Sequence, residues 1–320
     1  MKKILNPHLL PGLPDVDVSA PLVISNAGMK NTFNSLLPES FLRRSTVADI
    51  LPDLRPGLAC FQLFVGLRGS ARDLGVKAQN FWCFSRPDLD AAVGEYMALT
   101  PAEAVETETP LMFVSFPSAK DPTWEERFPT PDGTPKTTCA VVTLVNWDWF
   151  RKHEAAAADA TAAVKVRARD DDDYDELKAA LTRRLWDAVC RIFPQLADRV
   201  DYMEGGTPLS HNYYIKSTAG EIYGLDHDLK RFALDPLVRL RPDVGIPGLL
   251  MTGQDVFTCG FIGALYGGVA AAGAALGLGP RVFVQMDDIG KRWKPREEDE
   301  AEEEEEKAGQ KGERLKKKVS

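Results

Sequence analysis

Apolar and polar positions alternate in a way that predicts strands over much of residues 20–150. A short apolar run at 21–25 ends in the small-residue turn Asn26-Ala27-Gly28, which is typical of a strand that delivers a ligand-contacting loop. Later runs rich in β-branched and aromatic residues are separated by Gly, Pro and Asp turns. They lie at 60–65, 80–84, 111–116 and 139–145. We therefore expect a mixed sheet with one face covered.

Helical periodicity is found at three places. Residues 31–54 are predicted to be helical with two proline breaks, and 89–97 form one helical piece between strands. The clearest helix covers 175–193, with acidic residues at its start and arginines later, as the helix dipole prefers. Its apolar stripe, which we expect to be core, consists of Leu177, Leu181, Leu185, Val189 and Ile192-Phe193.

Residues 204–229 are predicted to follow a long irregular path. Its turns are fixed by Gly205-Gly206, Pro208, Gly220 and Gly224, and the segment is rich in Tyr, His, Asn and Asp. Long loops with that chemistry are usually functional. An ordinary polar surface loop, clamped by its tyrosines, fits the same residues equally well.

The stretch 246–278 organises the chain. It begins with the apolar strand 249–252, which Gly253 ends, and the single carboxylate of Asp255 stands at the strand exit. From 256 to 280 no residue carries a formal charge, and 13 of the 20 residues from Gly260 to Gly279 are Gly or Ala. Because side chains are nearly absent, a flat molecule could lie close to this backbone.

The helix predicted after Asp255 starts near Cys259-Gly260. Its first turn would offer free N–H groups and a partial positive charge to an electron-rich ligand atom. Two other interpretations remain open at this point. The segment is about long enough for a membrane span, although Gly and Ala are poorly lipophilic, and it would also suit a plain buried core helix.

Composition narrows the classes of function. The chain has 320 residues, 44% of them hydrophobic, which allows two domains of a soluble globular kind. The net charge of −8 comes largely from the run Asp170-Asp171-Asp172-Asp173 and a Glu-rich tail. A nucleic-acid-binding role has no electrostatic support and we exclude it.

A metal site is also not expected. The 5 cysteines are far apart and form no CxxC pair, and the 4 histidines show no HExxH or comparable ligand spacing. Prolines interrupt the apolar N-terminus, so we expect no signal peptide. Lys317-Lys318 resemble an endoplasmic-reticulum retrieval signal, an arrangement that also arises by chance in a lysine-rich tail.

Several motifs spread over most of the chain point to one family. They are PLVISNAGMKNTFNSLLPE at 21–39, FVGLRGSARDLGVKAQN at 64–80, LMFVSFPSAKDPTWEERFP at 111–129, GGTPLSHNYY at 205–214, YGLDHDL at 223–229 and MTGQDVFTCGFIGALYGG at 251–268. With them, residues 20–276 resemble the C-terminal half of the retinol saturase family (all-trans-retinol 13,14-reductase). This family lies within the flavin-dependent group of phytoene desaturases, carotenoid isomerases and amine oxidases.

The resemblance implies an α/β (α+β) fold in which a mixed-sheet substrate domain adjoins part of a Rossmann-type FAD domain. It implies that Asp255 bonds the ribityl or pyrophosphate region of FAD and that the helix from Gly260 points at the N1/O2 edge of the flavin. Reduction places negative charge there, which N–H donors stabilise. The cofactor-binding residues that follow from the resemblance are Ala27, Gly28, Gly253, Asp255, Cys259, Gly260 and Gly263.

The reaction implied by the resemblance is hydride transfer to a conjugated double bond of an apolar polyene, a retinoid or carotenoid, with protonation of the other carbon. Candidate proton donors are Tyr223 and His227, with Asp226 or Asp228 holding the imidazole. A structural role for His227 is an equal alternative. NAD(P)H is the candidate ultimate reductant, and the family implies peripheral association with the endoplasmic reticulum membrane. A carotenoid-isomerase-like enzyme and a non-catalytic apolar-lipid binding remnant of the fold remain alternatives.

The chain departs from the family at one motif. The family begins with a strand followed by GxGxxG, whose glycines hold the FAD pyrophosphate, and no GxGxxG occurs in these 320 residues. We therefore expect that the N-terminal, ADP-binding half is missing, through a truncated gene model, a split protein or a derivative that has lost FAD binding. Activity of the chain alone stays open.

The expected organisation has five parts. They are a lead-in at 1–20, an FAD-domain strand and connection at 21–58, the substrate domain at 59–244 with an exposed insertion near 154–173, the returning FAD-domain strand and helix at 245–286, and a disordered charged tail at 287–320.

Overall fold

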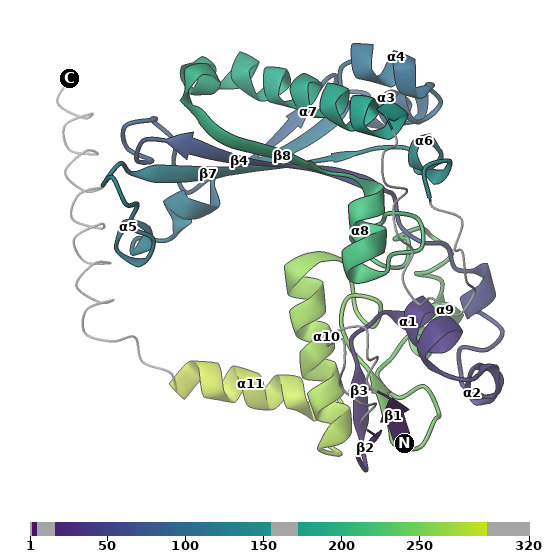
Figure 1. Cartoon of the computed structure of the whole chain (residues 1–320). Helices are drawn as coiled ribbons and strands as arrows, with labels where there is room; N and C mark the ends of the chain where they lie inside the picture. The colour runs from purple at the N-terminus through teal and green to yellow at the C-terminus, as the bar shows by residue number, and fades with distance from the viewer. Residues whose placement is uncertain (1, 5–16, 155–171, 293–320) are drawn as a thin grey trace.

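A five-stranded antiparallel sheet is the largest element of the computed structural model, which describes residues 2–4, 17–154 and 172–292 (Figure 1). The strand order is β5-β6-β7-β4-β8, and every neighbouring pair is antiparallel. The strands are β4 (Cys60–Arg68), β5 (Asn80–Phe84), β6 (Leu111–Ser115), β7 (Lys136–Leu144) and β8 (Val200–Gly206).

The expectation of a mixed sheet is wrong, although four strands lie where the sequence predicted them. An antiparallel sheet can leave one face open, whereas a parallel sheet needs both faces covered. Helices cover one face here: α3 (Leu89–Met97), α4 (Pro101–Glu106) and α7 (Asp172–Ile192) lie above the sheet in Figure 1. The opposite face carries exposed aromatic side chains, among them Phe64 and Trp82.

The main core lies between the sheet and α7. Alternate residues of β4, such as Phe61 and Leu63, point into it. The predicted stripe of α7 is confirmed at its buried positions Leu177, Leu181, Leu185 and Val189. Ile192 was wrongly placed in the core, because it is 45% exposed in the last turn of the helix.

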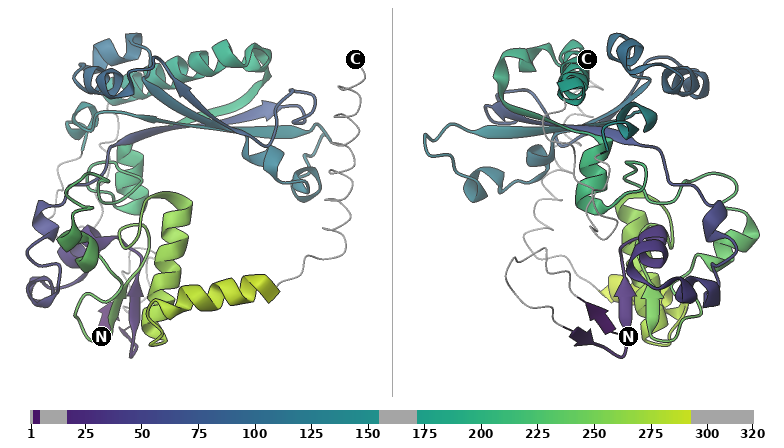
Figure 2. Two further views of the ribbon diagram at one scale, coloured as in Figure 1. Left: turned by 180° about the vertical axis from the view of Figure 1, so that it is seen from behind. Right: turned by 45° about the vertical axis from the view of Figure 1, so that its right-hand side comes forward.

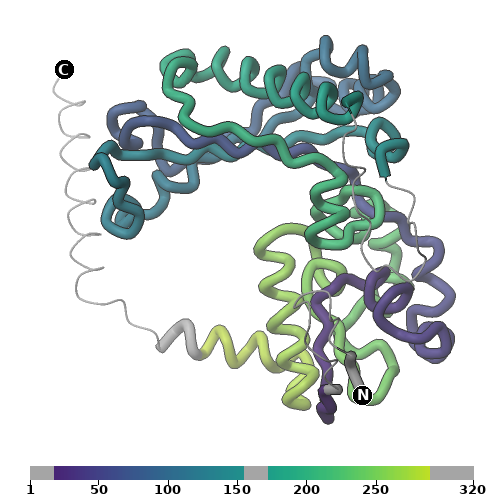
Figure 3. Tube along the Cα trace, viewed as in Figure 1, coloured from purple at the N-terminus to yellow at the C-terminus, as the bar shows by residue number. Residues whose placement is uncertain are grey.

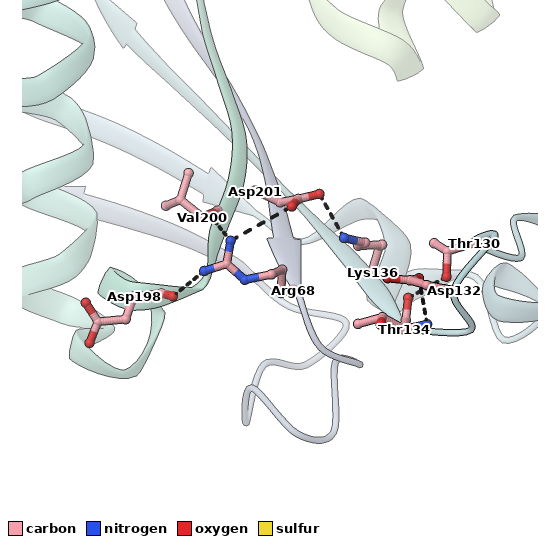
Figure 4. A network of polar contacts seen from close by, with 8 residues as sticks. All are labelled: Arg68, Thr130, Asp132, Thr134, Lys136, Asp198, Val200 and Asp201. Atoms are coloured by element: carbon pink, nitrogen blue, oxygen red, sulfur yellow. Dashed lines mark hydrogen bonds and ion pairs between the residues drawn. The ribbon is translucent and has the colours of Figure 1, made fainter.

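Polar contacts join the ends of three strands near the start of β8 (Figure 4). The guanidinium of Arg68 donates to the carbonyl oxygens of Val200 and Asp198 at 2.5 and 2.7 Å, and the Lys136 ammonium lies 2.8 Å from the Asp201 carboxylate. These side chains are partly exposed, so each ion pair adds only a few tenths of a kcal/mol, roughly. Their effect is to keep β4, β7 and β8 in register at this end.

A second, smaller core surrounds a parallel strand pair. Strand β3 (Val23–Ser25) pairs with β9 (Leu249–Met251), Val23 opposite Leu249. Leu225, Leu240 and Val244, which the sequence interpretation grouped with the sheet, belong to this second core. The two views of Figure 2 show the remaining elements around the pair. They are β1 (Lys2–Ile4), β2 (Asp17–Ser19), α1 (Met29–Asn31), α2 (Glu39–Arg44) and α9 (Leu234–Arg239).

Two C-terminal helices follow β9. The Gly/Ala-rich helix α10 (Gly260–Ala275) packs on the turn after β9, and α11 (Arg281–Arg292) continues from it, as the trace in Figure 3 shows. The charged tail from 287 is expected to be disordered or at most a solvated helix; residues 287–292 are the end of α11, and 293–320 lie outside the described residues. Within the described chain, no helix combines the length and apolar character that a membrane span requires.

The segment 204–229 contains more regular structure than predicted. Its first residues belong to β8, and helix α8 (Pro208–Ile215) follows, standing between the sheet and the second core in Figure 1. Thr207 caps this helix with Pro208 at its first position, a start signal that the sequence contained. Of the expected insertion, 155–171 lie outside the described residues, and α7 begins at Asp172. The remaining helices are short. They are α5 (Trp124–Arg127), α6 (Asp148–Arg151), the π-helical η2 (Thr32–Leu36) and the 3₁₀-helices η3 (Leu51–Asp53), η4 (Pro117–Lys120) and η5 (Pro194–Arg199).

The close approach of α7 to β8 depends on Gly205. A Cβ there would lie 2.5 Å from the Thr182 hydroxyl and 2.6 Å from the Phe61 ring. We predict that Gly205→Ala lowers the free energy of unfolding by about 1–3 kcal/mol through overpacking. Gly94→Ala is the control: its Cβ enters open space in α3, so it should raise stability by about 0.5–1 kcal/mol. Urea unfolding followed by circular dichroism measures both, and equal effects would contradict the packing argument.

Candidate functional site

A cleft of about 430 Å³ opens at the N-terminus of α10. Three chain segments meet in its wall: the turn after β3, the loop after α8, and the turn between β9 and α10. Its lining includes Ala27, Gly28, Lys30, Ser217, Glu221, Tyr223, Gly224, Asp255, Gly260 and Phe261. We call this the α10 cleft. Five of the sequence-predicted site residues line it, namely Ala27, Gly28, Tyr223, Asp255 and Gly260.

Asp255 joins the three segments. The residue is 4% exposed. Its Oδ2 accepts a hydrogen bond from the backbone N–H of Met29 and its Oδ1 accepts one from Leu225, both at 2.8 Å. Glycine is required beside it, because a Cβ on Gly224 would lie 2.1 Å from Oδ1. The buried carboxylate therefore holds the cleft walls together, and each oxygen keeps a second lone pair.

Arg231 supports the same turn from within the protein. Its buried guanidinium donates to the carbonyl oxygens of Leu225 and Gln254 at 2.7 and 2.8 Å, and to that of Asp255 at 3.3 Å. Burial lowers the pKa of Arg231, and the Asp255 carboxylate opposes this shift. Charged residues are rarely buried unless they are paired. Only the fold brings Arg231 to its partners, so this arginine was not among the residues predicted from the sequence.

Gly253 and Gly263, which the family resemblance assigns to cofactor binding, make close packing contacts within the protein. A Cβ on Gly253 would lie 2.1 Å from the Asn26 side chain, and one on Gly263 would lie 1.8 Å from the Thr258 carbonyl oxygen. These contacts let α10 lie directly on the turn after β9. Cys259 is the residue before the helix. At Gly260 the N–H donates to the Gln254 amide oxygen at 3.2 Å, which orients the start of α10 toward the cleft.

The candidate proton donors lie in different places. Tyr223 lines the cleft, and burial, followed by the nearby thiols of Cys60 and Cys259, raises its pKa. The ring of His227 lies outside the cleft lining, 3.4 Å from Arg231 Nη1. Burial and then Arg231 lower the pKa of His227. The Asp226 carboxylate accepts from the backbone N–H of His227 at 2.8 Å rather than from its imidazole.

Three polar residues of the cleft wall escaped the sequence analysis. Lys30 is half-buried; burial lowers its pKa, while the charges of Glu221 and Asp255 raise it. The buried Glu221 accepts from the backbone N–H groups of Thr218 and Ala219. Ser217 is buried as well, and its hydroxyl has no hydrogen-bond partner among the described residues. Its position in the cleft is set by α8, which the sequence analysis had not identified.

A larger cavity of about 940 Å³ adjoins the cleft under the open face of the sheet. Ile215 and Ile222 line both spaces, so the two are neighbours. Aromatic rings from the sheet, α7 and α8 dominate its wall: Phe64, Tyr174, Tyr202, Tyr213 and Tyr214. We call it the aromatic cavity. The two spaces therefore lie side by side, and the aromatic side chains gather in the larger one.

Loss of the Asp255 carboxylate should destabilise the fold even without a ligand. Asp255→Asn presents an amide NH₂ to one of two buried N–H donors, so we predict a loss of about 1.5–3 kcal/mol in the free energy of unfolding. Asp53→Asn, at an exposed carboxylate 3.7 Å from Lys230, should change it by less than about 0.5 kcal/mol. Denaturant unfolding of the ligand-free chain tests the pair. Equal stabilities would mean that Asp255 does not brace the cleft.

Comparison with known proteins places the chain in a family. No protein-family model matches it. It is 36% identical over 261 residues to the all-trans-retinol 13,14-reductase of Rattus norvegicus, which is 82% of this chain and 40% of that protein. It is 35% identical over 277 residues to the protein of the same name from Danio rerio, 86% of this chain and 43% of that protein.

A third relative has a different name. An inactive all-trans-retinol 13,14-reductase of Danio rerio is 30% identical over 265 residues, which is 83% of this chain and 41% of that protein. The chain thus spans about two fifths of the length of the curated relatives it matches. By this similarity, over more than four fifths of its own length, the chain belongs to the all-trans-retinol 13,14-reductase family.

Proposed function

We propose that this chain is the flavin-facing and substrate-facing part of an FAD-dependent reductase that saturates one carbon–carbon double bond of a retinoid. The observation that carries the proposal is the α10 cleft, which opens at the start of a 16-residue helix and is lined by residues from three chain segments. Its volume lies within the range of about 300–1,000 Å³ that is usual for ligand sites. Membership in the reductase family supplies the reaction class.

The residues present fit a flavin at this place. Gly28, Gly224 and Gly260 leave backbone exposed at the cleft wall, and the first turn of α10 directs N–H groups and a partial positive charge toward it. An electron-rich ring edge would be stabilised there. When bound, the flavin would supply the hydride. Residues of this chain would bind its ring end through the N-terminus of α10.

The pyrophosphate end of FAD would be held by polypeptide that is not part of this sequence. The parallel pair β3–β9 supports this, because strands of parallel sheets almost always belong to larger sheets covered on both faces. Within the described chain β3 pairs only with β9, and Ile24 of β3 is exposed. A further parallel strand beside β3, followed by a GxGxxG turn, would complete the binding site.

The polyene would lie in the aromatic cavity with its reacting bond toward the cleft. Aromatic rings offer large apolar contact surfaces to a conjugated chain. At the junction, Tyr223 is the residue placed to protonate the second carbon, since it lines the cleft and its raised pKa keeps the hydroxyl protonated. His227 is less suited, because Arg231 and burial favour its neutral form.

The test is flavin binding and product mass with the whole chain. We predict that FAD titration gives bound-flavin absorbance and that retinol with a flavin reductant gains two hydrogens. Phe261 is 80% exposed at the start of α10 and lines the cleft. Phe261→Asp should weaken FAD binding about tenfold or more, because it places a negative charge at the ring site. Leu229→Asp, 93% exposed outside the cleft, is the control.

Absence of both bound flavin and reduced polyene would refute the proposal for this chain. A product of unchanged mass but altered double-bond geometry would instead indicate an isomerase.

The pH dependence tests Tyr223 separately. Because its pKa is raised, the neutral donor persists as pH rises through the ordinary tyrosine range near 10. We predict that turnover by the wild type does not fall there and that Tyr223→Phe lowers turnover about 10²-fold or more at every pH. Tyr266→Phe, in the ring stack with Phe257 outside both cavities, should be neutral. Unchanged turnover in Tyr223→Phe would exclude it as the donor.

A second candidate function is apolar-ligand binding without catalysis. It is favoured by the aromatic cavity, whose lining comes from β4, β8, α7, α8 and the loop after α8. In that case the chain would bind retinol while binding no flavin. The titrations above separate the two functions directly.

A further inference from the structure

Strand β5 forms one edge of the five-stranded sheet, and its outer side is open. Among the described strands it pairs with β6 alone, in an unbroken register that sets Trp82 opposite Phe113. The strand has the sequence NFWCF, with no charged residue, no proline and no bulge. Natural sheets usually protect an edge with one of these features, and an edge without them is a template for pairing with another strand.

The opposite edge of the same sheet is protected. It is formed by β8, which carries the charged side chains of Asp201 and Glu204. The register between β4 and β8 also shifts between Gly66 and Leu67. Charged side chains and an irregular register both hinder the addition of a further strand. The contrast identifies β5 as the edge that is open to a partner.

The hydrogen-bond pattern shows which backbone groups of β5 face outward. Just after the strand, the N–H of Ser85 donates to the carbonyl oxygen of Pro110 at 3.1 Å, in the same register as the β5–β6 pairs. Bonded and non-bonded residue pairs alternate along an antiparallel ladder, so Phe81 and Cys83 are the residues that bond β6. The other residues direct their N–H and C=O groups outward, where no described residue bonds them: Asn80, Trp82 and Phe84.

The side chains beside this free backbone edge are aromatic and exposed on the open face of the sheet. Trp82 is 60% exposed and Phe84 is 53% exposed. The Trp82 ring packs edge to face on Phe113 of β6, with ring centroids 4.9 Å apart. Neither Trp82 nor Phe84 lines the α10 cleft or the aromatic cavity. A partner strand could therefore contact both a backbone edge and an aromatic surface.

The charges near the two ends of β5 differ in sign. Lys77 precedes the strand, and the Lys120 ammonium donates to the side-chain oxygen of Asn80 at 2.5 Å. Asp88 and Asp90 follow the strand and are exposed. When two such strands run antiparallel, the start of one lies beside the end of the other. The lysines of one copy would then lie near the aspartates of the second, and opposite charges across a strand pair are favourable.

We propose that β5 is an interface between two copies of this chain, which pair antiparallel about a two-fold axis at Trp82. In this register Trp82 lies opposite the same residue of the second copy, and Asn80 lies opposite Phe84. Three residue pairs would exchange about six backbone hydrogen bonds, two for each pair. The outward groups, the aromatic rings and the end charges all match under the same rotation, which is what a two-fold interface requires.

The assembly stops at the dimer, because pairing about a two-fold axis uses the open edge of both copies and leaves only the protected β8 edges. Two five-residue strands bury a small surface. We therefore expect a reversible dimer with a dissociation constant on the order of 1–100 µM, rather than an obligate one.

The first test is sedimentation velocity on the whole 320-residue chain over a series of concentrations. Trp82→Lys removes the aromatic pair and sets like charges opposite each other at the axis, so it should weaken dimerisation about tenfold or more. Val284→Lys is the control, because Val284 is 63% exposed on α11 and distant in the fold from β5. It should leave the dimer unchanged.

A second test reads the register and keeps the strand uncharged. Opposite residues of a bonded antiparallel pair have Cα atoms about 5.5 Å apart, a distance that a disulfide spans. Oxidation of Trp82→Cys with diamide should therefore give covalent dimers above the level of the wild type. Phe84→Cys is the matched control: it is offset by four residues from its own copy, about 13 Å along the strand, and should give no increase.

Three results would each overturn the proposal. One is a wild-type chain that stays monomeric up to several hundred micromolar, roughly a tenfold excess over the expected dissociation constant; the edge would then be covered by a different polypeptide or by none. The others are a dimer that Val284→Lys disrupts and Trp82→Lys does not, and equal crosslinking of the two cysteine variants. None of these measurements involves flavin or polyene, so the outcome is independent of the proposed function.

Discussion

The cleft depends on one buried carboxylate. Asp255 accepts hydrogen bonds from backbone N–H groups that lie 226 and 30 residues away in the sequence, and Arg231 holds the carbonyl oxygens of the same turn. These hydrogen bonds satisfy the buried carboxylate of Asp255 and the buried guanidinium of Arg231, which would otherwise be buried without partners. The start of α1, the loop after α8 and the turn before α10 are therefore fixed relative to one another, and the cleft is the space that they leave.

The two cavities come from different parts of the fold. The α10 cleft is built from turns and a helix start, so short residues such as Ala27, Gly28 and Gly224 line it. The aromatic cavity is built on the open face of an antiparallel sheet, where outward positions carry Phe64 and Tyr202. Ile215, the last residue of helix α8, lines both spaces. One short helix therefore contributes to the walls of both.

Much of the framework could be predicted from local pattern. Strands β4, β5, β6 and β7 and helix α3 lie where alternation and periodicity placed them, and the buried stripe of α7 holds except for Ile192. In the small-residue run after Asp255, Gly263 and Gly267 lie against the backbone of Thr258 and Gly253; the contact with a flat molecule stays a prediction. Pattern failed where tertiary contacts decide: β8 was not predicted as a strand, yet it pairs with β4, and the sheet is antiparallel throughout. The family, too, was recognised from motifs, and similarity to known reductases confirms it.

The sequence by itself determined the family, the strand and helix segments, and the presence of Asp255 beside a Gly/Ala-rich helix, because these depend on residues close together in the chain. Only the tertiary structure decided how those pieces meet. Lys30 and Ser217 line the α10 cleft beside residues that are distant in sequence, such as Asp255 and Gly260. Whether a polar atom is buried without a partner is a property of packing, and no local pattern encodes it.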